Sequence, residues 1–201
     1  MTEWLFSNTA DTPRLPLLIG LIGLILWTGE VISLFITWKP GKGTEKDKGS
    51  FVFIASAWTL AITFSVFDAL TYRLTTLPYH LSWIQYGGIP LIIIGFALRV
   101  PARLALGHAL SPFVQTSNPG GLVTNGIYSL IRHPAYLGAL SQLVGIALCF
   151  GSIIGVAAGI LGGIPALLYR IRVEEQALRE WFGKDYEQYA ARTSRMIPPL
   201  W

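Results

Sequence analysis

Three long apolar runs set the pattern of hydrophobic and polar positions in the first half of the chain. They cover residues 15–38, 51–70 and 83–106, and polar segments separate them. A helix needs about 20 apolar residues to cross a bilayer, so each run predicts one transmembrane helix. The first run is too long and begins too late to be a signal peptide.

A fourth apolar run, residues 136–169, carries no charged side chain. It is too long for one ordinary span and short for two. We interpret it as two short helices in a hairpin that breaks near Gly151 and Ser152; the alternative is one long tilted helix with a re-entrant end. The pattern therefore predicts an all-α integral membrane protein with five transmembrane helices, the last two forming the hairpin.

The basic residues favour this odd number of spans. Four lysines lie in the linker 39–50. The others near the end of a span are Arg99, Arg103 and Arg132 for the third, and Arg170, Arg172, Arg179, Lys184, Arg192 and Arg195 for the fifth. With the amino terminus outside, every one of the 15 lysines and arginines except Arg14 and Arg73 is cytoplasmic. Cytoplasmic loops carry such an excess, so we expect a cytosolic carboxyl terminus, in a bacterial inner membrane or the endoplasmic reticulum.

The composition agrees with a membrane location. Of the 201 residues, 52% are hydrophobic and 13% are charged, whereas a soluble domain carries about 25% charged residues. This length suits a single domain. The net charge of +4 comes from residues between apolar runs and not from a basic stripe, so we expect no nucleic-acid partner.

The sequence contains no motif for a metal or for a Rossmann-type cofactor site. His80, His108 and His133 are scattered, without Cys or Asp neighbours at metal-ligand spacing, so no metal site is expected. The single cysteine, Cys149, lies in an apolar segment and is expected to pack there. Neither a Gly-x-Gly-x-x-Gly turn after a strand nor a P-loop is present.

Four glycines, Gly151, Gly155, Gly159 and Gly163, recur every four residues and fall along one helical face. Small residues in this arrangement let helix backbones approach closely in membranes. We expect the fifth span to pack through this face against the fourth span or a neighbour. A homodimer seam through the same face is an alternative.

Two polar clusters flank the predicted hairpin and can meet on one face of the membrane. After the hairpin, residues 169–181 are predicted to continue as a helix that leaves the bilayer. Arg170 and Glu174 share one face of this helix, and Glu175 points about a quarter turn away. An Arg–Glu pair at this spacing is commonly only an exposed salt bridge, so it carries little weight alone.

Together, the order and spacing of the polar motifs resemble the isoprenylcysteine carboxyl methyltransferase family, which includes phospholipid N-methyltransferases. The matching residues are Leu122, Val123, Gly126 and Tyr128; Arg132, His133, Pro134, Tyr136 and Gly138; Arg170, Glu174 and Glu175; Phe182, Gly183, Tyr186 and Tyr189; and Arg195 and Pro198. The resemblance covers residues 104–201, which we expect to form the catalytic region. Residues 1–103 then supply the first three spans of the same structural domain.

The resemblance implies S-adenosylmethionine, bound at the cytosolic membrane face in a pocket that the carboxyl-terminal helical segment completes. Glu174 or Glu175 suits its ammonium group, Tyr128 and Tyr136 suit aromatic contact, and His133 suits its carboxylate. The full set of residues implied in cofactor binding is His108, Leu122, Val123, Gly126, Tyr128, Arg132, His133, Pro134, Tyr136, Glu174 and Glu175. Many relatives carry a His where this chain has Gly121, and His108 is a candidate to replace it.

The resemblance also implies a lipophilic acceptor, of which prenylcysteine is the best-known example in the family. A carboxylate acceptor needs no base but only a cation to orient it, and Arg170 is our choice. A thiol or amine acceptor would instead need deprotonation, by Glu174 or His133. The sequence leaves the methylated atom open.

Two acidic residues lie inside predicted spans, where ionisable groups are functional candidates. Glu30, in the first span, is expected to approach the entrance for the acceptor. Asp68, near the end of the second span, is expected to meet Arg73 or water.

Two other functional classes stay open. A sterol-reductase-like enzyme that uses NADPH also carries His-Pro-x-Tyr and a Tyr-rich tail. Such an enzyme would carry a Cys shortly after its acidic residues, where this chain has Ala177 and Leu178. A non-enzymatic scaffold or small transporter would have no need for polar residues clustered on one side only.

Overall fold

The computed structural model describes residues 14–37, 47–70, 79–107 and 121–198, and the regular elements in these ranges are helical. In chain order they are α2 (Arg14–Thr37), α3 (Ser50–Leu70), η2 (Tyr79–Gly87), α4 (Gly88–Leu106), η4 (Gly126–Ser129), α5 (Pro134–Cys149), α6 (Ile153–Ala158), η5 (Gly159–Gly163), α7 (Ile164–Phe182) and α8 (Lys184–Arg192). Within the described ranges, β-type pairing is limited to an isolated parallel bridge between Ile131 and Ser194. The predicted all-α fold is confirmed.

Four helical stretches of the described chain are long and apolar enough to cross a membrane. They are Arg14–Ser33, Ser50–Leu70, Leu81–Leu106 and Ile153–Phe182. Large apolar side chains on these helices are exposed in the isolated chain, as lipid-facing residues would be. The multi-pass membrane architecture is therefore confirmed. The number of five spans stays a prediction, because α5 has 16 residues and a span needs about 20.

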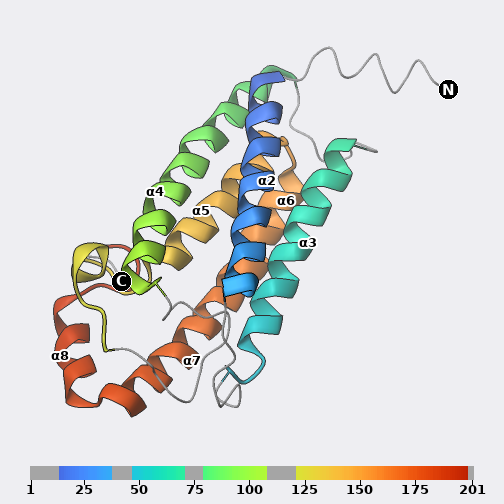
Figure 1. Cartoon of the computed structure of the whole chain (residues 1–201). Helices are drawn as coiled ribbons and strands as arrows, with labels where there is room; N and C mark the ends of the chain where they lie inside the picture. Colours follow the sequence, from blue (N-terminus) through green and yellow to red (C-terminus); the bar gives the residue numbers. More distant parts are fainter. Residues whose placement is uncertain (1–13, 38–46, 71–78, 108–120, 199–201) are drawn as a thin grey trace.

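Long helices that follow one another in the chain run in opposite directions (Figure 1). The end of α2, the start of α3, the end of α4 and the start of α5 all lie at one end of the bundle, which we call the site end. The lower half of α7 and the whole of α8 lie there too. The start of α3 and the carboxyl-terminal segment thus share one end of the bundle, as predicted. Which side of the membrane this end faces stays a prediction.

The predicted break between the last two apolar helices is present. Gly151 has a φ of 69°, in the left-handed region that favours glycine, and reverses the chain after α5. The Ser152 hydroxyl accepts a hydrogen bond from the Gly155 amide at 3.1 Å and so caps α6. The returning helix is continuous from α6 through the π-helical η5 to the end of α7. Residues 136–169 therefore do not form one continuous helix, and whether α5 crosses the membrane or ends inside it stays a prediction.

The glycine face of the returning helix is used within the chain. A methyl group on Gly163 would lie 3.3 Å from Nε1 of Trp58 in α3, and one on Gly159 would lie 3.5 Å from Leu143 in α5. One on Gly155 would press against Ser65 of α3. The expected packing against the fourth predicted span is confirmed, and α3 shares the face. The homodimer seam through this face stays a prediction.

A second glycine seam, which the sequence analysis did not identify, joins α4 to α5. A methyl group on Gly95 would lie 2.7 Å from the carbonyl oxygen of Gly138. One on Gly145 would lie 2.8 Å from the carbonyl oxygen of Gly88. These distances leave no room for any side chain, so the two backbones touch. This seam fixes the start of α5, and with it the residues of the site, against the end of α4.

Candidate active site

The segment before α5 pairs with the segment after α8 at the site end. The Arg132 amide donates to the Ser194 carbonyl at 2.9 Å, and the His133 amide donates to the Arg195 carbonyl at 3.0 Å. In return, the Ser194 amide donates to the Leu130 carbonyl at 3.2 Å. The two polar clusters that flank the hairpin in the sequence are therefore adjacent in space.

Glu175, on α7, is the buried centre of a group of charged side chains. Its carboxylate accepts from Arg132 Nε at 3.1 Å, from Arg195 Nη2 at 3.0 Å and from Arg179 at 3.4 Å, and Nε2 of His133 lies 3.5 Å away. Only 1% of Glu175 is exposed. Both carboxylate oxygens are thus occupied by side chains of the protein. This differs from the expectation that Glu175 can take the ammonium of a cofactor.

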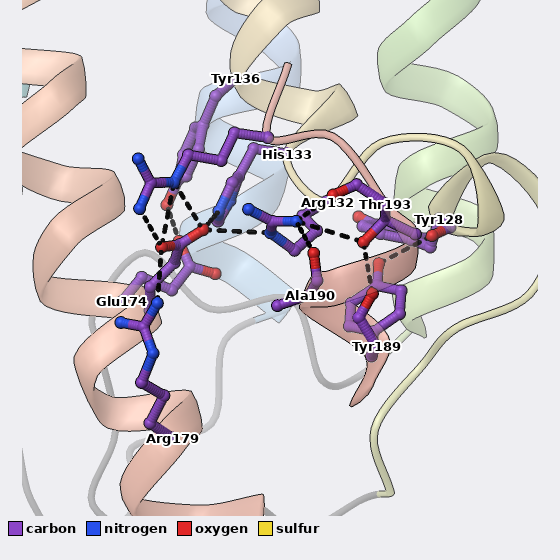
Figure 2. Close-up of polar contacts among 11 residues, drawn as sticks. Tyr128, Arg132, His133, Tyr136, Glu174, Arg179, Tyr189, Ala190 and Thr193 are labelled. Carbon is purple, nitrogen blue, oxygen red and sulfur yellow. Dashed lines mark hydrogen bonds and ion pairs between the residues drawn. The ribbon is translucent and has the colours of Figure 1, made fainter. Parts of the chain in front are cut away.

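Arg132 joins this group of charged side chains to the end of α8. Its Nη1 donates to the carbonyl of Ala190 at 2.9 Å and to the carbonyl of Thr193 (Figure 2). Orphan carbonyls at a helix carboxyl end are commonly satisfied by a cation in this way. Arg132 therefore holds the carboxyl-terminal segment in place, and its guanidinium faces Glu175 and not an open cavity.

His133 directly precedes α5, whose first residue is Pro134. Proline at this position starts a helix without losing a hydrogen bond. The imidazole is buried and lies parallel to the ring of Tyr136, with centroids 5.6 Å apart and an interplanar angle of 19°. Its Nε2 has no hydrogen-bond partner among the described residues; the nearest acceptor is the Glu175 carboxylate at 3.5 Å. The ring nitrogen therefore points to a buried acid, which makes His133 a poor base for an exposed acceptor.

Glu174 has surroundings unlike those of its neighbour. It is half-buried, and its carboxylate accepts a hydrogen bond of 2.6 Å from the Tyr136 hydroxyl. That hydroxyl in turn accepts from Arg170 Nε at 3.1 Å. Arg170 is only 3% exposed, and its Nη1 donates to Asp47 and Ser50 at the start of α3. Glu174 is thus a partly accessible carboxylate held at the end of a buried hydrogen-bonded chain.

Two tyrosines of the matched motifs form a scaffold beside this series of hydrogen bonds. The Tyr189 hydroxyl donates to the carbonyl of Tyr128 at 2.7 Å, and the Tyr128 hydroxyl lies 3.5 Å from the carbonyl of Ala102 in α4. Burial raises the pKa of Tyr189 to about 12, although the charge of Arg132 lowers it. Burial, and then the charge of Glu174, raise the pKa of Tyr128 still further. Both hydroxyls therefore stay protonated at neutral pH and act as donors.

An open pocket lies between the segment before η4 and α8. Its volume is about 480 Å³, and its lining residues are Gly121, Leu122, Thr124, Phe182, Asp185, Gln188, Tyr189 and Arg192. Of the residues implied in cofactor binding, Leu122 lines this pocket, and Val123 lies in the sequence between the lining residues Leu122 and Thr124. Gly126 has a φ of 58°, which a residue with a side chain rarely adopts. The pocket therefore lies beside the matched motifs but is lined mainly by residues that the resemblance did not mark.

Comparison with known proteins places these motifs in a family. The family model for phospholipid methyltransferases matches residues 83–185. The chain belongs to this family. A probable protein-S-isoprenylcysteine O-methyltransferase of Oryza sativa subsp. indica is 29% identical over 159 residues, which cover 78% of this chain and 83% of that relative. Protein-S-isoprenylcysteine O-methyltransferase A of Arabidopsis thaliana is 28% identical over 202 residues, which cover 98% of each.

A solved structure agrees with this membership. The eukaryotic intramembrane Ras methyltransferase, an isoprenylcysteine carboxyl methyltransferase, superposes with a TM-score of 0.59 at 27% sequence identity. The match covers 72% of this chain and 51% of that one, so the chain spans about half the length of the solved relative. The predicted enzyme class, a membrane methyltransferase, is confirmed by these relatives, and the reductase and scaffold classes lose their support.

Several residues with a predicted role are not part of the group around the Glu174 carboxylate. Two of them, His108 and Arg73, lie outside the described ranges. Glu30, in α2, forms an ion pair with Arg99 of α4 at 2.8 Å, so its charge is already balanced within the membrane. Asp68 is buried near the end of α3. The roles proposed for these residues from the sequence stay predictions.

One residue that reaches the candidate site was not predicted from the sequence. Asp47 belongs to the lysine-rich linker, and nothing in its local pattern separates it from a solvated loop residue. The one informative feature is its position. Asp47 lies three residues before Ser50, the first residue of an apolar helix, and acidic residues are common near the start of a helix. This position predicts the start of α3 but not the contact with Arg170.

Proposed function

We propose that the chain transfers the methyl group of S-adenosylmethionine to a lipophilic acceptor at the cytosolic face of a membrane. The observation that carries the proposal is the half-buried Glu174 carboxylate, which Tyr136 and Arg170 hold in place inside the motifs of a methyltransferase family. A fixed acid next to aromatic rings suits a ligand with an ammonium and a sulfonium.

The residues present fit this cofactor. Glu174 is the acid best placed for its ammonium group, since Glu175 is fully occupied by arginines. The open pocket beside Tyr189 offers Leu122 and Phe182 as apolar surfaces for a flat base. Gly121, at the rim of the same pocket, has no neighbour within 4 Å of where a methyl group would stand, so there is space at the position where many relatives carry a His. S-Adenosylmethionine, when bound, supplies a methyl group already activated on a sulfonium.

The work of the protein is then alignment and exclusion of water. Effective alignment of two reactants can supply about 7–11 kcal/mol of a reaction barrier. The rings of His133 and Tyr136 form one rigid wall, and the Tyr136 hydroxyl is fixed on both sides by Glu174 and Arg170. No general base is required if the acceptor is a carboxylate.

We take the acceptor to be a prenylcysteine-like carboxylate carried on a lipid chain. The Oryza and Arabidopsis relatives are named for isoprenylcysteine O-methylation, and the apolar outer faces of the helices suit an acceptor that arrives through the bilayer. Arg170 was expected to clamp the carboxylate in a fork. Its Nη1 and Nε are committed to Asp47, Ser50 and Tyr136, so we propose instead that it acts through Tyr136.

We also propose the orientation of the chain. Placing the site end in the cytosol puts the arginines of α7 and α8 on the positive-inside face. The same face holds the start of α3. The membrane would be a bacterial inner membrane or the endoplasmic reticulum.

A product search tests the proposal. Purified protein in nanodiscs is incubated with methyl-labelled S-adenosylmethionine and a total lipid extract, and labelled products are identified by mass. We expect label in a lipophilic ester. Thermal stabilisation by NADPH but not by S-adenosylhomocysteine would instead restore the reductase reading.

A further inference from the structure

The start of α3 reaches the candidate site from the other half of the chain. Asp47 directly precedes this helix in space: its Oδ2 accepts from the Phe51 amide at 3.0 Å, and its Oδ1 accepts from the Ser50 hydroxyl at 3.2 Å. A carboxylate that accepts from an amide in the first turn of a helix stabilises that end of the helix. Asp47 lies outside residues 83–185, to which the family model applies.

The same carboxylate is paired with α7. Arg170 Nη1 donates to Asp47 Oδ1 and, at 2.8 Å, to the Ser50 hydroxyl. Both members of the ion pair are buried, with side-chain exposures of 4% and 6%. Because the helix start also binds the carboxylate, Asp47 is held in place and is not a mobile counter-ion that an acceptor would displace.

The hydrogen bonds continue from this pair to the acid of the site. Arg170 Nε donates to the Tyr136 hydroxyl, which donates to Glu174. Removing the negative charge of Asp47 would leave the buried guanidinium of Arg170 without this counter-charge. The guanidinium would then be drawn toward the carboxylate of Glu174. The position of the Glu174 carboxylate therefore depends on a residue that precedes α3, far from α7 in the sequence.

A second contact joins the same two elements without touching the site. The Tyr169 hydroxyl donates to the Lys48 carbonyl at 3.1 Å, and Lys48 Nζ donates to the Gln176 side chain at 3.2 Å. Lys48 and Gln176 are exposed. This exposed pair ties α3 to α7 just as Asp47 does but has no link to Tyr136, which makes it a matched control.

We infer that Asp47 is a positioning residue for methyl transfer: it fixes Arg170 and, through Arg170, the Tyr136 hydroxyl and the Glu174 carboxylate. The inference rests on the proposed function. It adds a residue from the first half of the chain to a site that the family motifs place in the second half.

The test compares Asp47→Asn with Gln176→Ala in nanodiscs. Asparagine keeps a cap for α3 but loses the charge that Arg170 requires. We expect kcat with a prenylcysteine acceptor to fall about 10- to 100-fold, because small displacements in a site cost this much. We expect KM for the acceptor to change less than threefold, and Gln176→Ala to keep the rate of the unmodified protein.

A double-mutant cycle separates positioning from simple loss of structure. If Asp47 acts through Tyr136, the double variant Asp47→Asn with Tyr136→Phe should be no slower than Tyr136→Phe alone. Rate losses that multiply would overturn the inference, as would an unchanged kcat in Asp47→Asn. Asp47→Ser, which also caps a helix, replaces Asp47→Asn if that variant does not fold. Absence of methyl transfer by the unmodified protein overturns the proposed function together with this inference.

Discussion

At the scale of the residue, the most informative feature is the contrast between two adjacent glutamates of α7. Glu174 and Glu175 lie in different surroundings. Helical geometry turns Glu175 about 100° from Glu174. One side chain therefore enters the cluster of Arg132, Arg179 and Arg195, while the other stays half-buried beside Tyr136. We propose that the first contributes to stability and that the second binds the ligand.

Substituting each glutamate by glutamine should separate these two roles. Glu175→Gln leaves Arg132, whose side chain is only 9% exposed, without its counter-charge, and breaking such a pair typically costs about 3–5 kcal/mol of folding free energy. We expect a lower melting temperature of the intact protein in detergent. Glu174→Gln should keep that melting temperature but weaken S-adenosylhomocysteine binding by about 1–3 kcal/mol, because a charged hydrogen-bond acceptor is lost.

Calorimetric titration measures the affinity, and circular dichroism measures the melting. Glu187→Gln, at an exposed acid of α8, is the control for charge alone. The assignment of roles fails if Glu174→Gln binds the cofactor product as tightly as the unmodified protein does.

Arg170→Lys tests the guanidinium fork. A lysine keeps the positive charge but lacks the second nitrogen that reaches Tyr136 while the first holds Asp47. We expect turnover to fall strongly and S-adenosylhomocysteine affinity to fall with it, because Tyr136 and the Glu174 carboxylate lose the support of Arg170. The measurement is initial rate against acceptor concentration. Full turnover in this variant would show that the hydrogen bond from Nε is dispensable.

Much of this local chemistry could be predicted from the sequence, but its partners could not. Periodicity correctly turned Glu174 and Glu175 to different sides of α7. It could not tell which side meets the carboxyl-terminal segment, because that depends on the pairing of Arg132 with Ser194. Asp47 escaped prediction because its partner is far away in the sequence, and only tertiary packing brings the two together.

Among the secondary-structure elements, contacts between glycines decide where the helices lie. The break at Gly151 was predictable because glycine followed by serine interrupts an apolar run. The seam between α4 and α5 was not, since Gly88, Gly95, Gly138 and Gly145 become neighbours only after the two helices align. Gly183, with a φ of 49°, separates α8 from α7 and gives the carboxyl-terminal segment its turn toward the site.

Gly95→Ala tests the seam against Gly29→Ala. A methyl group at Gly95 meets Gln142 and the Gly138 carbonyl, whereas one at Gly29 of α2 has nothing within 4 Å. We expect Gly95→Ala to lose about 1–3 kcal/mol of stability through overpacking and Gly29→Ala to lose none. Thermal unfolding of the intact protein in detergent measures both. Equal melting temperatures would mean that α4 and α5 can separate at no cost.

At the scale of the whole molecule, an alternating bundle brings both halves of the chain to one end. α2 and α3 meet there, and so do α4, α5 and α7 (Figure 1). The distribution of basic residues in the sequence predicted this shared end before any contact was known. The length of α5 was harder to predict, because no charged residue lies where its apolar run ends.

The single native cysteine makes the topology directly testable. Cys149 is buried, so an introduced cysteine is read against a low background. We expect Lys48→Cys and Lys184→Cys, at two exposed positions, to react with a membrane-impermeant maleimide from the same side. That side should be the cytosol, judged by labelling of intact and opened cells. Labelling from opposite sides would rule out the shared site end.

The most direct measurement of the central claim is single-turnover methyl transfer in nanodiscs. Protein preloaded with methyl-labelled S-adenosylmethionine is mixed with a farnesylated cysteine, and base-labile methyl ester is counted. The account predicts ester formation by the unmodified protein and by Glu187→Gln, and a strong loss of it in Glu174→Gln. Ester formation at full rate by Glu174→Gln, or none by the unmodified protein, would contradict it.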